Sequence, residues 1–236
     1  MTTRNRGKQP NDDKYFNSKW FPIFTKAIDD LCFLLTREYS NNSALQVVGN
    51  RYKLNKRQRN AVLRVSCSND AITNRNQSKC EAKDVEHKII EIDGFNLLIL
   101  LESALSGAFI FKARDGIYRD ISSVHGSYKR VMKTEEAILI VGNCLKKLNV
   151  KSVKWYLDQP VSNSGRLKTR LREISTEHHF DWEVELVYDP DKVLAKSSNI
   201  VVSSDGWILD NAENWFNLGA YLFENDFVLN ANIIEV

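Results

Sequence analysis

The stretch IIEIDGFNLLILLESAL, from Ile89 to Leu105, changes its pattern half-way along. Its first part is a short apolar run ending in Asp93, which is typical of a buried strand in a parallel sheet. Its second part is a short apolar helix that carries one acid, Glu102. A buried carboxylate without a partner is costly, so each of these two acids requires an explanation in structure or in chemistry.

The second half of the chain continues this alternation of strand and helix. Two β-prone runs joined by Asp115-Gly116 predict a hairpin. Trp207 and Trp215 are eight residues apart in the last predicted helix, which is the spacing of a core face, and base stacking is the lesser alternative. We therefore expect an α/β fold, with a mainly parallel sheet flanked by helices. The predicted strands are 88–93, 153–158, 182–188 and 199–205, and the predicted helices are 133–149, 164–178 and 206–223.

The first half of the chain is predicted to be helical. Apolar periodicity predicts a helix over 20–39, and a short helix follows with Ser43 as its cap. Asn55 and Gln58 form the pattern of a capping box, which opens a helix reaching about residue 66. A polar helix is expected over 69–84. The resulting division is a flexible tail (1–13), a small all-α basic domain (14–85) and an α/β domain (86–236).

Charge is divided along the chain in a similar way. Residues 1–90 hold 17 Lys and Arg against 9 Asp and Glu, whereas residues 91–236 hold 16 against 21. A basic segment joined to an acidic one fits a nucleic-acid grip joined to a metal-binding core. A solvated helix face is the alternative, and Arg64 could instead bridge to the acidic domain. The candidate nucleic-acid-binding residues are Arg51, Lys53, Lys56, Arg57 and Arg59, with Tyr52 available for stacking.

Three predicted strands end in an aspartate, namely Asp93, Asp158 and Asp205. Ligands of an open parallel sheet bind outside the carboxyl ends of its strands, so these side chains are expected to converge. Converging carboxylates repel one another unless cations neutralise them, and hard oxygen ligands suit Mg²⁺ or Mn²⁺. Alternatively, each Asp caps the next helix or begins a turn. Further candidates are Glu102, Asp120, Asp189, Asp191 and Asp210.

The same residues carry a resemblance to a known superfamily. EIDGFNLL (91–98) is similar to the opening motif of NYN domains, a branch of the PIN-like nucleases. WYLD (155–158) resembles the middle strand of that superfamily, and NIVVSSDGWILD (199–210) resembles its late strand and helix. The resemblance covers about residues 88–223. The whole chain also looks like a prokaryotic two-domain family of unassigned activity, with a small basic helical N-domain before a PIN-like C-domain.

The resemblance implies a ribonuclease that depends on Mg²⁺ or Mn²⁺. It implies that Asp93, Asp158 and Asp205 are catalytic metal ligands and that Asn96 orients a ligand or a bound water. Glu102 would join the metal ligands from the following helix, or would pair with an arginine such as Arg114 or Arg119. Asp120 completes the set of metal-ligand candidates.

The chain departs from the family pattern in two places. The predicted hairpin is inserted after the first helix, and the loop QPVSNSG (159–165) is unusually polar. Ser162, Asn163 and Ser164 in this loop either contact a phosphate at a helix N-terminus or form an ordinary turn and cap. His125, in a Gly-flanked loop, is a further candidate for an acid or base.

We therefore expect a nuclease that hydrolyses phosphodiesters with a metal-bound water, with RNA favoured over DNA. The alternatives are a non-catalytic nucleic-acid-binding protein and a DNA-binding regulator. The sequence lacks the GxGxxG and GxxxxGK[ST] patterns of nucleotide-binding proteins, a Ser-nucleophile elbow and an HExxH motif. Without a signal-peptide pattern or a membrane-length apolar run, the cytoplasm is the expected compartment. Whether the chain forms a homo-oligomer is left open.

Overall fold

The chain folds around a six-stranded sheet in the computed structural model, which describes residues 6–122, 128–129 and 131–235. His125 lies outside these residues. Each neighbouring pair of strands in this main sheet is parallel, so the carboxyl ends of all its strands face the same way. In spatial order the strands are β1 (Lys79–Cys80), β8 (Asn214–Phe216), β7 (Ile200–Val202), β2 (Ile89–Asp93), β5 (Ser152–Asp158) and β6 (Trp182–Val187).

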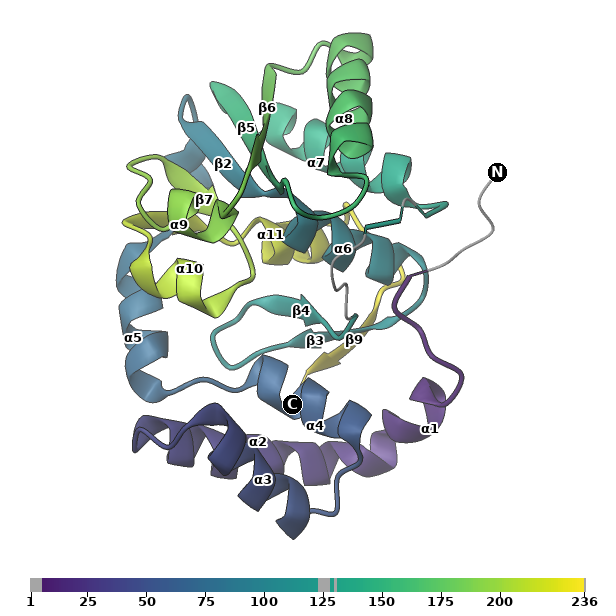
Figure 1. The fold of residues 1–236 in the computed structure, drawn as a ribbon, viewed down its shortest axis with the longest axis vertical. Helices are drawn as coiled ribbons and strands as arrows, with labels where there is room; N and C mark the ends of the chain where they lie inside the picture. Colours follow the sequence, from purple (N-terminus) through teal and green to yellow (C-terminus); the bar gives the residue numbers. More distant parts are fainter. Residues whose placement is uncertain (1–5, 123–127, 130, 236) are drawn as a thin grey trace.

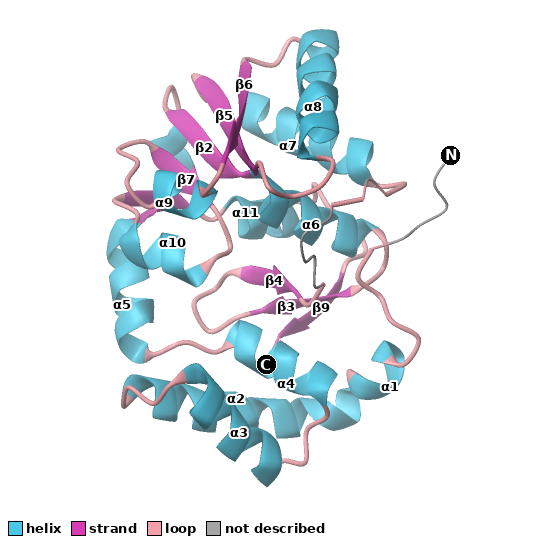
Figure 2. Ribbon diagram, in the orientation of Figure 1, coloured by secondary structure: helices cyan, strands magenta, loops and turns pink. Residues whose placement is uncertain are grey.

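Helices cover both faces of the main sheet (Figure 2). Ile90 and Ile92 of β2 join a core formed with α6 (Gly94–Leu105), α7 (Thr134–Lys147), α8 (Ser164–His178) and α11 (Leu218–Glu224). On the other face, Tyr156 and Val201 join a smaller core with α9 (Pro190–Leu194) and α10 (Gly206–Asn211). The predicted fold class, a mainly parallel α/β sheet flanked by helices and preceded by a helical region, is confirmed.

A second sheet lies between the main sheet and the N-terminal helices (Figure 1). The hairpin predicted around Asp115-Gly116 supplies two of its strands, which pair antiparallel, and Gly116 adopts a positive φ of 74° in the turn. The third strand comes from the end of the chain and pairs parallel with the first hairpin strand, an addition that the sequence did not predict. The spatial order is β4 (Tyr118–Asp120), β3 (Phe109–Lys112) and β9 (Asn232–Glu235).

The N-terminal helices follow the predicted outline closely. The capping box of Asn55 and Gln58 is present at the start of α4, while Ser40 rather than Ser43 accepts the capping bond of α3. The predicted helix over 69–84 is interrupted by β1 and is completed by a short 3₁₀ helix, η2 (Ala82–Val85). The helices are α1 (Asp12–Tyr15), η1 (Ser18–Trp20, a 3₁₀ helix), α2 (Phe21–Thr36), α3 (Asn41–Arg51), α4 (Lys56–Val65) and α5 (Asn69–Ser78).

These helices share a core with the second sheet. Phe111 and Ile121, from or beside the hairpin, and Ile234 of β9 pack with the buried faces of α2, α3 and α4. The predicted boundary between residues 85 and 86 therefore does not separate two independent cores. Residues 6–13, expected to belong to a flexible tail, also contact the body of the protein, because Arg6 bonds with Glu102 and Asp12 with Arg57.

The predicted final helix over 206–223 is wrong. The chain forms α10, then strand β8, then α11, because the segment around Trp215 pairs with β7 and β1. Asn217 then caps α11. Trp215 is buried and its indole N–H donates to the carbonyl of Arg75, whereas Trp207 is 51% exposed. The two tryptophans therefore do not share a core face. No helix of the described ranges is long and apolar enough to cross a bilayer.

Candidate active site

Asp93 lies at the carboxyl end of β2, in the middle of the main sheet. Its side chain is 5% exposed and accepts hydrogen bonds from the Asn96 amide side chain and from the Ser203 hydroxyl, the latter at 2.8 Å. Burial raises the pKa of Asp93 to about 6, the charge of Asp191 adds to the rise, and the bonds from Asn96 and Ser203 oppose it. Asn96 therefore orients the Asp93 carboxylate directly.

The turn after β2 requires a residue without a side chain. A Cβ atom on Gly94 would lie 2.6 Å from Cδ2 of Leu157 and 3.0 Å from the carbonyl oxygen of Tyr156. Contacts this short would displace the backbone of β5 or of the turn. Gly94 thus lets α6 begin directly against the neighbouring strand and holds Asp93 at the sheet edge.

Asp205 reaches the same edge from the loop after β7. Its carboxylate accepts hydrogen bonds from the backbone N–H groups of Trp207 (2.8 Å) and Ile208 (3.4 Å), so it caps α10. Its own N–H donates to the hydroxyl of Ser203, which also donates to Asp93. One serine therefore links the ends of the two neighbouring strands.

The ends of β5 and β6 contribute three more aspartates. Burial and the charge of Asp189 raise the pKa of Asp158. Asp189 caps α9 and pairs with Lys192, which lowers the pKa of Asp189. Asp191 is exposed, and its pKa is raised first by partial desolvation and then by the charges of Asp205, Asp189 and Asp158. Asp191 therefore lies near enough to these three aspartates for their charges to act on it.

The edge acids are hereafter Asp93, Asp158, Asp189, Asp191 and Asp205. Carboxylates that raise one another's pKa form an arrangement that a hard divalent cation would relieve, so the chemistry of the donor set fits such an ion. Asp158 and Asp191 have no hydrogen-bond or ion-pair partner for their carboxylates in the described part of the chain. Within the described residues, however, no three His, Cys, Asp or Glu side chains converge closely enough to hold a metal ion.

Glu102 does not belong to the edge acids. It lies eight residues beyond Gly94, about 12 Å along α6 from the sheet edge. Its fully buried carboxylate bonds with Arg6 and accepts bonds from the hydroxyls of Tyr128 and Thr134. Burial raises its pKa, and the charge of Arg6 opposes the rise. The expected place of Glu102 in the metal site is therefore corrected, and its arginine partner is Arg6 rather than Arg114 or Arg119.

Asp120 is also held away from the edge acids. It ends β4 in the second sheet, where it is buried and accepts a bond of 2.6 Å from the backbone N–H of Ser122. Arg64 donates to the Asp120 carbonyl at 3.3 Å and its guanidinium lies 3.9 Å from the Asp120 carboxylate. The prediction that Asp120 is a metal ligand is corrected, whereas Arg64 does bridge the helical and acidic parts of the chain.

The predicted basic grip divides into surface and interior residues. Arg57 donates to Asp12 and to the carbonyls of Gly7 and Ile121, and Arg59 donates to the Leu54 carbonyl. Both arginines therefore hold the fold together. The residues that remain on the surface are Arg51, which lies 3.4 Å from Asp30, and Lys53 and Lys56, which are exposed.

The polar loop after β5 gives a similar division. Ser164 is buried and its hydroxyl donates to the carbonyl of Gln159. Ser162 is exposed, with its carbonyl accepting a bond from the N–H of Tyr128. Asn163 is also exposed, and its side-chain amide donates to the carbonyl of Tyr128 at 2.8 Å. Of the three predicted phosphate contacts, Ser162 and Asn163 therefore lie at the surface and Ser164 does not.

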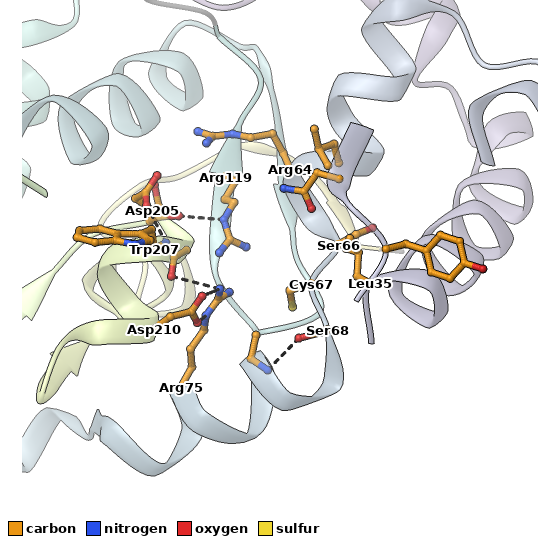
Figure 3. Close-up of a pocket in the computed structure, with 16 residues that line it drawn as sticks. Leu35, Arg64, Ser66, Cys67, Ser68, Arg75, Arg119, Asp205, Trp207 and Asp210 are labelled. Carbon is orange, nitrogen blue, oxygen red and sulfur yellow. Dashed lines mark hydrogen bonds and ion pairs between the residues drawn. The ribbon is translucent and has the colours of Figure 1, made fainter. Parts of the chain in front are cut away.

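Two buried arginines hold the loop that carries Asp205 (Figure 3). Arg75 of α5 and Arg119 of β4 both bond to the carboxylate of Asp115 in the hairpin turn. Arg119 also donates to the carbonyl of Ser204 at 3.0 Å, and Arg75 to that of Gly206 at 3.3 Å. We call Arg75, Asp115 and Arg119 the interior seam. The inserted hairpin thereby fixes the backbone on both sides of Asp205.

The interior seam was not foreseen from the sequence. Arg75 lies in a polar helix where nothing local signals burial, and its partner Asp115 lies 40 residues further along the chain. Asp210, a predicted acid candidate, receives bonds from Arg75 on the exposed side and so belongs with the seam.

Comparisons with known proteins identify relatives of both parts of the chain. A family model described as "Domain of unknown function (DUF5616)" matches residues 82–221, and one described as "Protein of unknown function (DUF434)" matches residues 23–78. The chain is 38% identical over 184 residues to "Uncharacterized protein MJ0935" of Methanocaldococcus jannaschii. The aligned segment covers 78% of this chain and 88% of the relative. No solved structure matches significantly. The gap between the two matched segments, residues 79–81, contains β1.

Proposed function

The chain belongs to the family described as "Domain of unknown function (DUF5616)", and we propose that it is a nuclease that hydrolyses RNA phosphodiesters with the help of Mg²⁺ or Mn²⁺. The observation that carries this proposal is geometric: β7, β2, β5 and β6 lie side by side with their carboxyl ends at one edge of the main sheet, and Ser203 links Asp93 to Asp205 there. The resemblance to PIN-like and NYN domains supports the same activity, because it assigns metal-ligand roles to Asp93, Asp158 and Asp205.

The edge acids differ in how they are held. Asp93 is fixed by Asn96 and Ser203, and Asp205 is fixed by the N-terminus of α10. Asp158 and Asp191 carry no such bonds, so their oxygens can turn towards a cation without breaking an existing contact. We assign the holding of the ion to Asp158 and Asp191, supported by Asp93 and Asp205. A divalent ion bound there would polarise a phosphodiester and lower the pKa of an attacking water.

A second candidate function is nucleic-acid binding without catalysis. Asp93, Asp189 and Asp205 each accept a capping bond from the helix that follows them. This observation favours the second candidate, because a capping carboxylate has a structural role without any metal. A DNA-binding regulator is one form of it, in which the helix pair of α3 and α4 would contact the duplex.

Cleavage assays separate the two candidates. Labelled single-stranded RNA and DNA are incubated with the purified chain in Mg²⁺, Mn²⁺ or EDTA, beside Asp93→Asn and Asp158→Asn variants. Removing one preorganised group from a charged active site costs ~10²–10³-fold in rate, so we expect that loss in both variants. Asp181→Asn is the matched control, because Asp181 is exposed and precedes β6 at the opposite end of the strand.

Thermal stability gives a readout that does not depend on turnover. An ion that binds only the folded chain stabilises it by about 2.7 kcal/mol when its concentration is 100 times the dissociation constant. We expect Mn²⁺ to raise the melting temperature of the parent chain and of Asp181→Asn, and to have a much smaller effect on Asp158→Asn. Cleavage that persists in EDTA and in Asp93→Asn would contradict the proposal, and nucleic-acid binding without cleavage would favour the second candidate.

A further inference from the structure

A cleft lies between α10 and the N-terminal helices, next to Asp205. Its volume is about 530 Å³, within the range of pockets that hold small organic ligands. Residues from α4, α5, β4 and the β7–α10 loop contribute to its walls, and Figure 3 shows Trp207 on one side with Leu35 and Ser66 across from it. Asp205 lines this cleft and also belongs to the edge acids. The cleft and the proposed active site therefore share this residue.

Trp207 is an exposed aromatic side chain of this cleft, and it lies two residues after the edge acid Asp205. Half of its surface is open to solvent, although a buried indole would stabilise the fold more. Its backbone N–H donates to the carboxylate of Asp205 at 2.8 Å, so the position of the tryptophan is tied to that of the acid. Tyr39, from the loop after α2, also lines the cleft and is 53% exposed. The cleft thus presents aromatic rings that the protein core does not use.

Arg64 differs from the two other arginines of the cleft. The side chains of Arg75 and Arg119 are each 6% exposed, and both bond to Asp115. The side chain of Arg64 is 37% exposed, with contacts of 3.3 Å and 3.9 Å to Asp120. Its guanidinium therefore keeps donors that face the cleft and can bond a phosphate oxygen.

We propose that this cleft binds a single-stranded segment of nucleic acid, with one base stacked on Trp207 and a backbone phosphate bound by Arg64. A tryptophan face stacks on any base, and the stacking contributes about 1–3 kcal/mol per base. In a duplex both faces of each base are already stacked on neighbours, so the site selects unpaired nucleotides. The inference rests on the proposed function for its purpose, since Asp205 would bring the bound strand beside the edge acids.

Binding is measured with the full-length Asp93→Asn chain, so that cleavage does not consume the probe. The probes are fluorescent single strands of about twelve nucleotides: oligouridylate, oligothymidylate and an abasic strand of the same length, together with a duplex. We expect Trp207→Ala to weaken oligouridylate binding by ~10-fold and Trp207→Phe to restore most of it. The abasic strand should bind Trp207→Ala and its parent equally.

Two further variants complete the design. Phe33→Ala is the matched control, because Phe33 is an exposed aromatic of α2 that does not line the cleft. It should bind like the parent. Arg64→Gln should weaken all single strands alike and reduce the dependence of log K on log salt by about one. Equal losses for oligouridylate and oligothymidylate identify a site for any single strand, whereas a larger loss for oligouridylate identifies an RNA site.

Three results overturn the inference: no single-strand binding by the parent, an unchanged affinity in Trp207→Ala, or an equal loss with the abasic strand. Other results would contradict the proposed nuclease function without contradicting the inference about the cleft. If the chain with Asp93 intact binds through Trp207 and does not cleave, the inference stands and the nuclease proposal is wrong. If it cleaves, and Trp207→Ala leaves both cleavage and binding unchanged, the cleft is not the substrate path and the nuclease proposal stands.

Discussion

In the interior seam, Asp115 lies between Arg75 and Arg119, whereas at the carboxyl edge Asp191 lies among the charges of three other aspartates. The two regions have opposite effects on their carboxylates. In the seam, Arg119 and then Arg75 lower the pKa of Asp115 against the effect of burial. At the edge, burial and neighbouring acids raise the pKa of Asp191.

The difference shows which charges hold the fold and which are open to a ligand. A carboxylate bonded to two arginines has its lone pairs occupied and resists protonation. A carboxylate facing others of its kind gains free energy from a proton or a cation. The seam and the edge are also joined, because Arg75 and Arg119 fix the carbonyls on either side of Asp205. The seam therefore supplies the rigidity that the edge needs.

The largest effect is expected from breaking the seam. Asp115→Asn leaves two buried arginines without a full counter-charge, and breaking a buried ion pair costs about 3–5 kcal/mol. Urea denaturation at neutral pH measures the loss. Because the pKa of Asp115 is lowered in the folded state, its contribution is present above its unfolded pKa and is lost as the pH falls through the lower folded value. The difference between parent and variant should thus shrink in acid.

Asp210→Asn is the matched control for the seam. Asp210 contacts Arg75 as well, but its side chain is 39% exposed and Arg75 keeps Asp115 as a partner. Its loss should stay near the ~0–1 kcal/mol of a surface pair. Equal losses in the two variants would show that the seam is no stronger than a surface contact.

The second-largest change in the free energy of unfolding is expected from Asp93→Asn, which should stabilise the protein rather than destabilise it. The folded pKa of Asp93, about 6, exceeds the unfolded value of about 4, so the folded state holds the proton more tightly. Stability therefore falls as the pH rises between these two values, by ~3 kcal/mol at most. Asp93→Asn lacks this penalty and should be more stable than the parent at pH ~8, with the gain fading towards pH ~4.

Denaturation curves at several pH values check this expectation. A variant that is less stable at every pH would mean that Asp93 serves the fold, as the capping alternative holds. In the proposed nuclease, cleavage by the parent should rise as the pH increases through about 6, because the ionised carboxylate is the form that binds a cation. Stabilisation together with lost cleavage is the combination expected of a functional residue.

The sequence predicts four of the six strands of the main sheet and three of the edge acids for physical reasons that are local. Apolar runs such as that of β2 are buried on both faces and end where the chain leaves the sheet, so Asp93, Asp158 and Asp205 could be placed at one edge. The hairpin at Asp115-Gly116 is equally local, since its turn requires a positive φ at the second position.

The failures concern pairings between distant segments. The helix predicted over 206–223 has helical spacing, and only pairing with β7 and β1 turns the segment around Trp215 into a strand. Glu102 looked like an edge acid because the sequence does not show that Arg6 reaches it from the N-terminus. The influence of Asp158 and Asp205 on Asp191 depends likewise on the pairing of strands far apart in the sequence, which no local pattern encodes.

A smaller effect is expected from Glu102→Gln, which tests whether Glu102 belongs with the edge. Gln can keep the bonds to Tyr128 and Thr134 but leaves Arg6 without its counter-charge, so a loss of about 2 kcal/mol is expected. The Mn²⁺-dependent rise in melting temperature should be unchanged, because Glu102 lies about 12 Å along α6 from the sheet edge. If Mn²⁺ no longer raised the melting temperature of Glu102→Gln, Glu102 would have to be a metal ligand.

The smallest effect on stability is expected from Lys56→Gln, a variant that tests whether the nucleic acid binds in the cleft or along the basic face of α4. Lys56 is exposed at the first position of α4, about 12 Å along the helix from Arg64. Lys56→Gln should change stability by less than ~0.5 kcal/mol. If the strand follows the cleft, Lys56→Gln leaves the salt dependence of binding near that of the parent, while Arg64→Gln reduces it by about one. Equal reductions would mean that the strand runs along α4, as the charge pattern of the sequence suggested, and that Arg64 acts as part of that face.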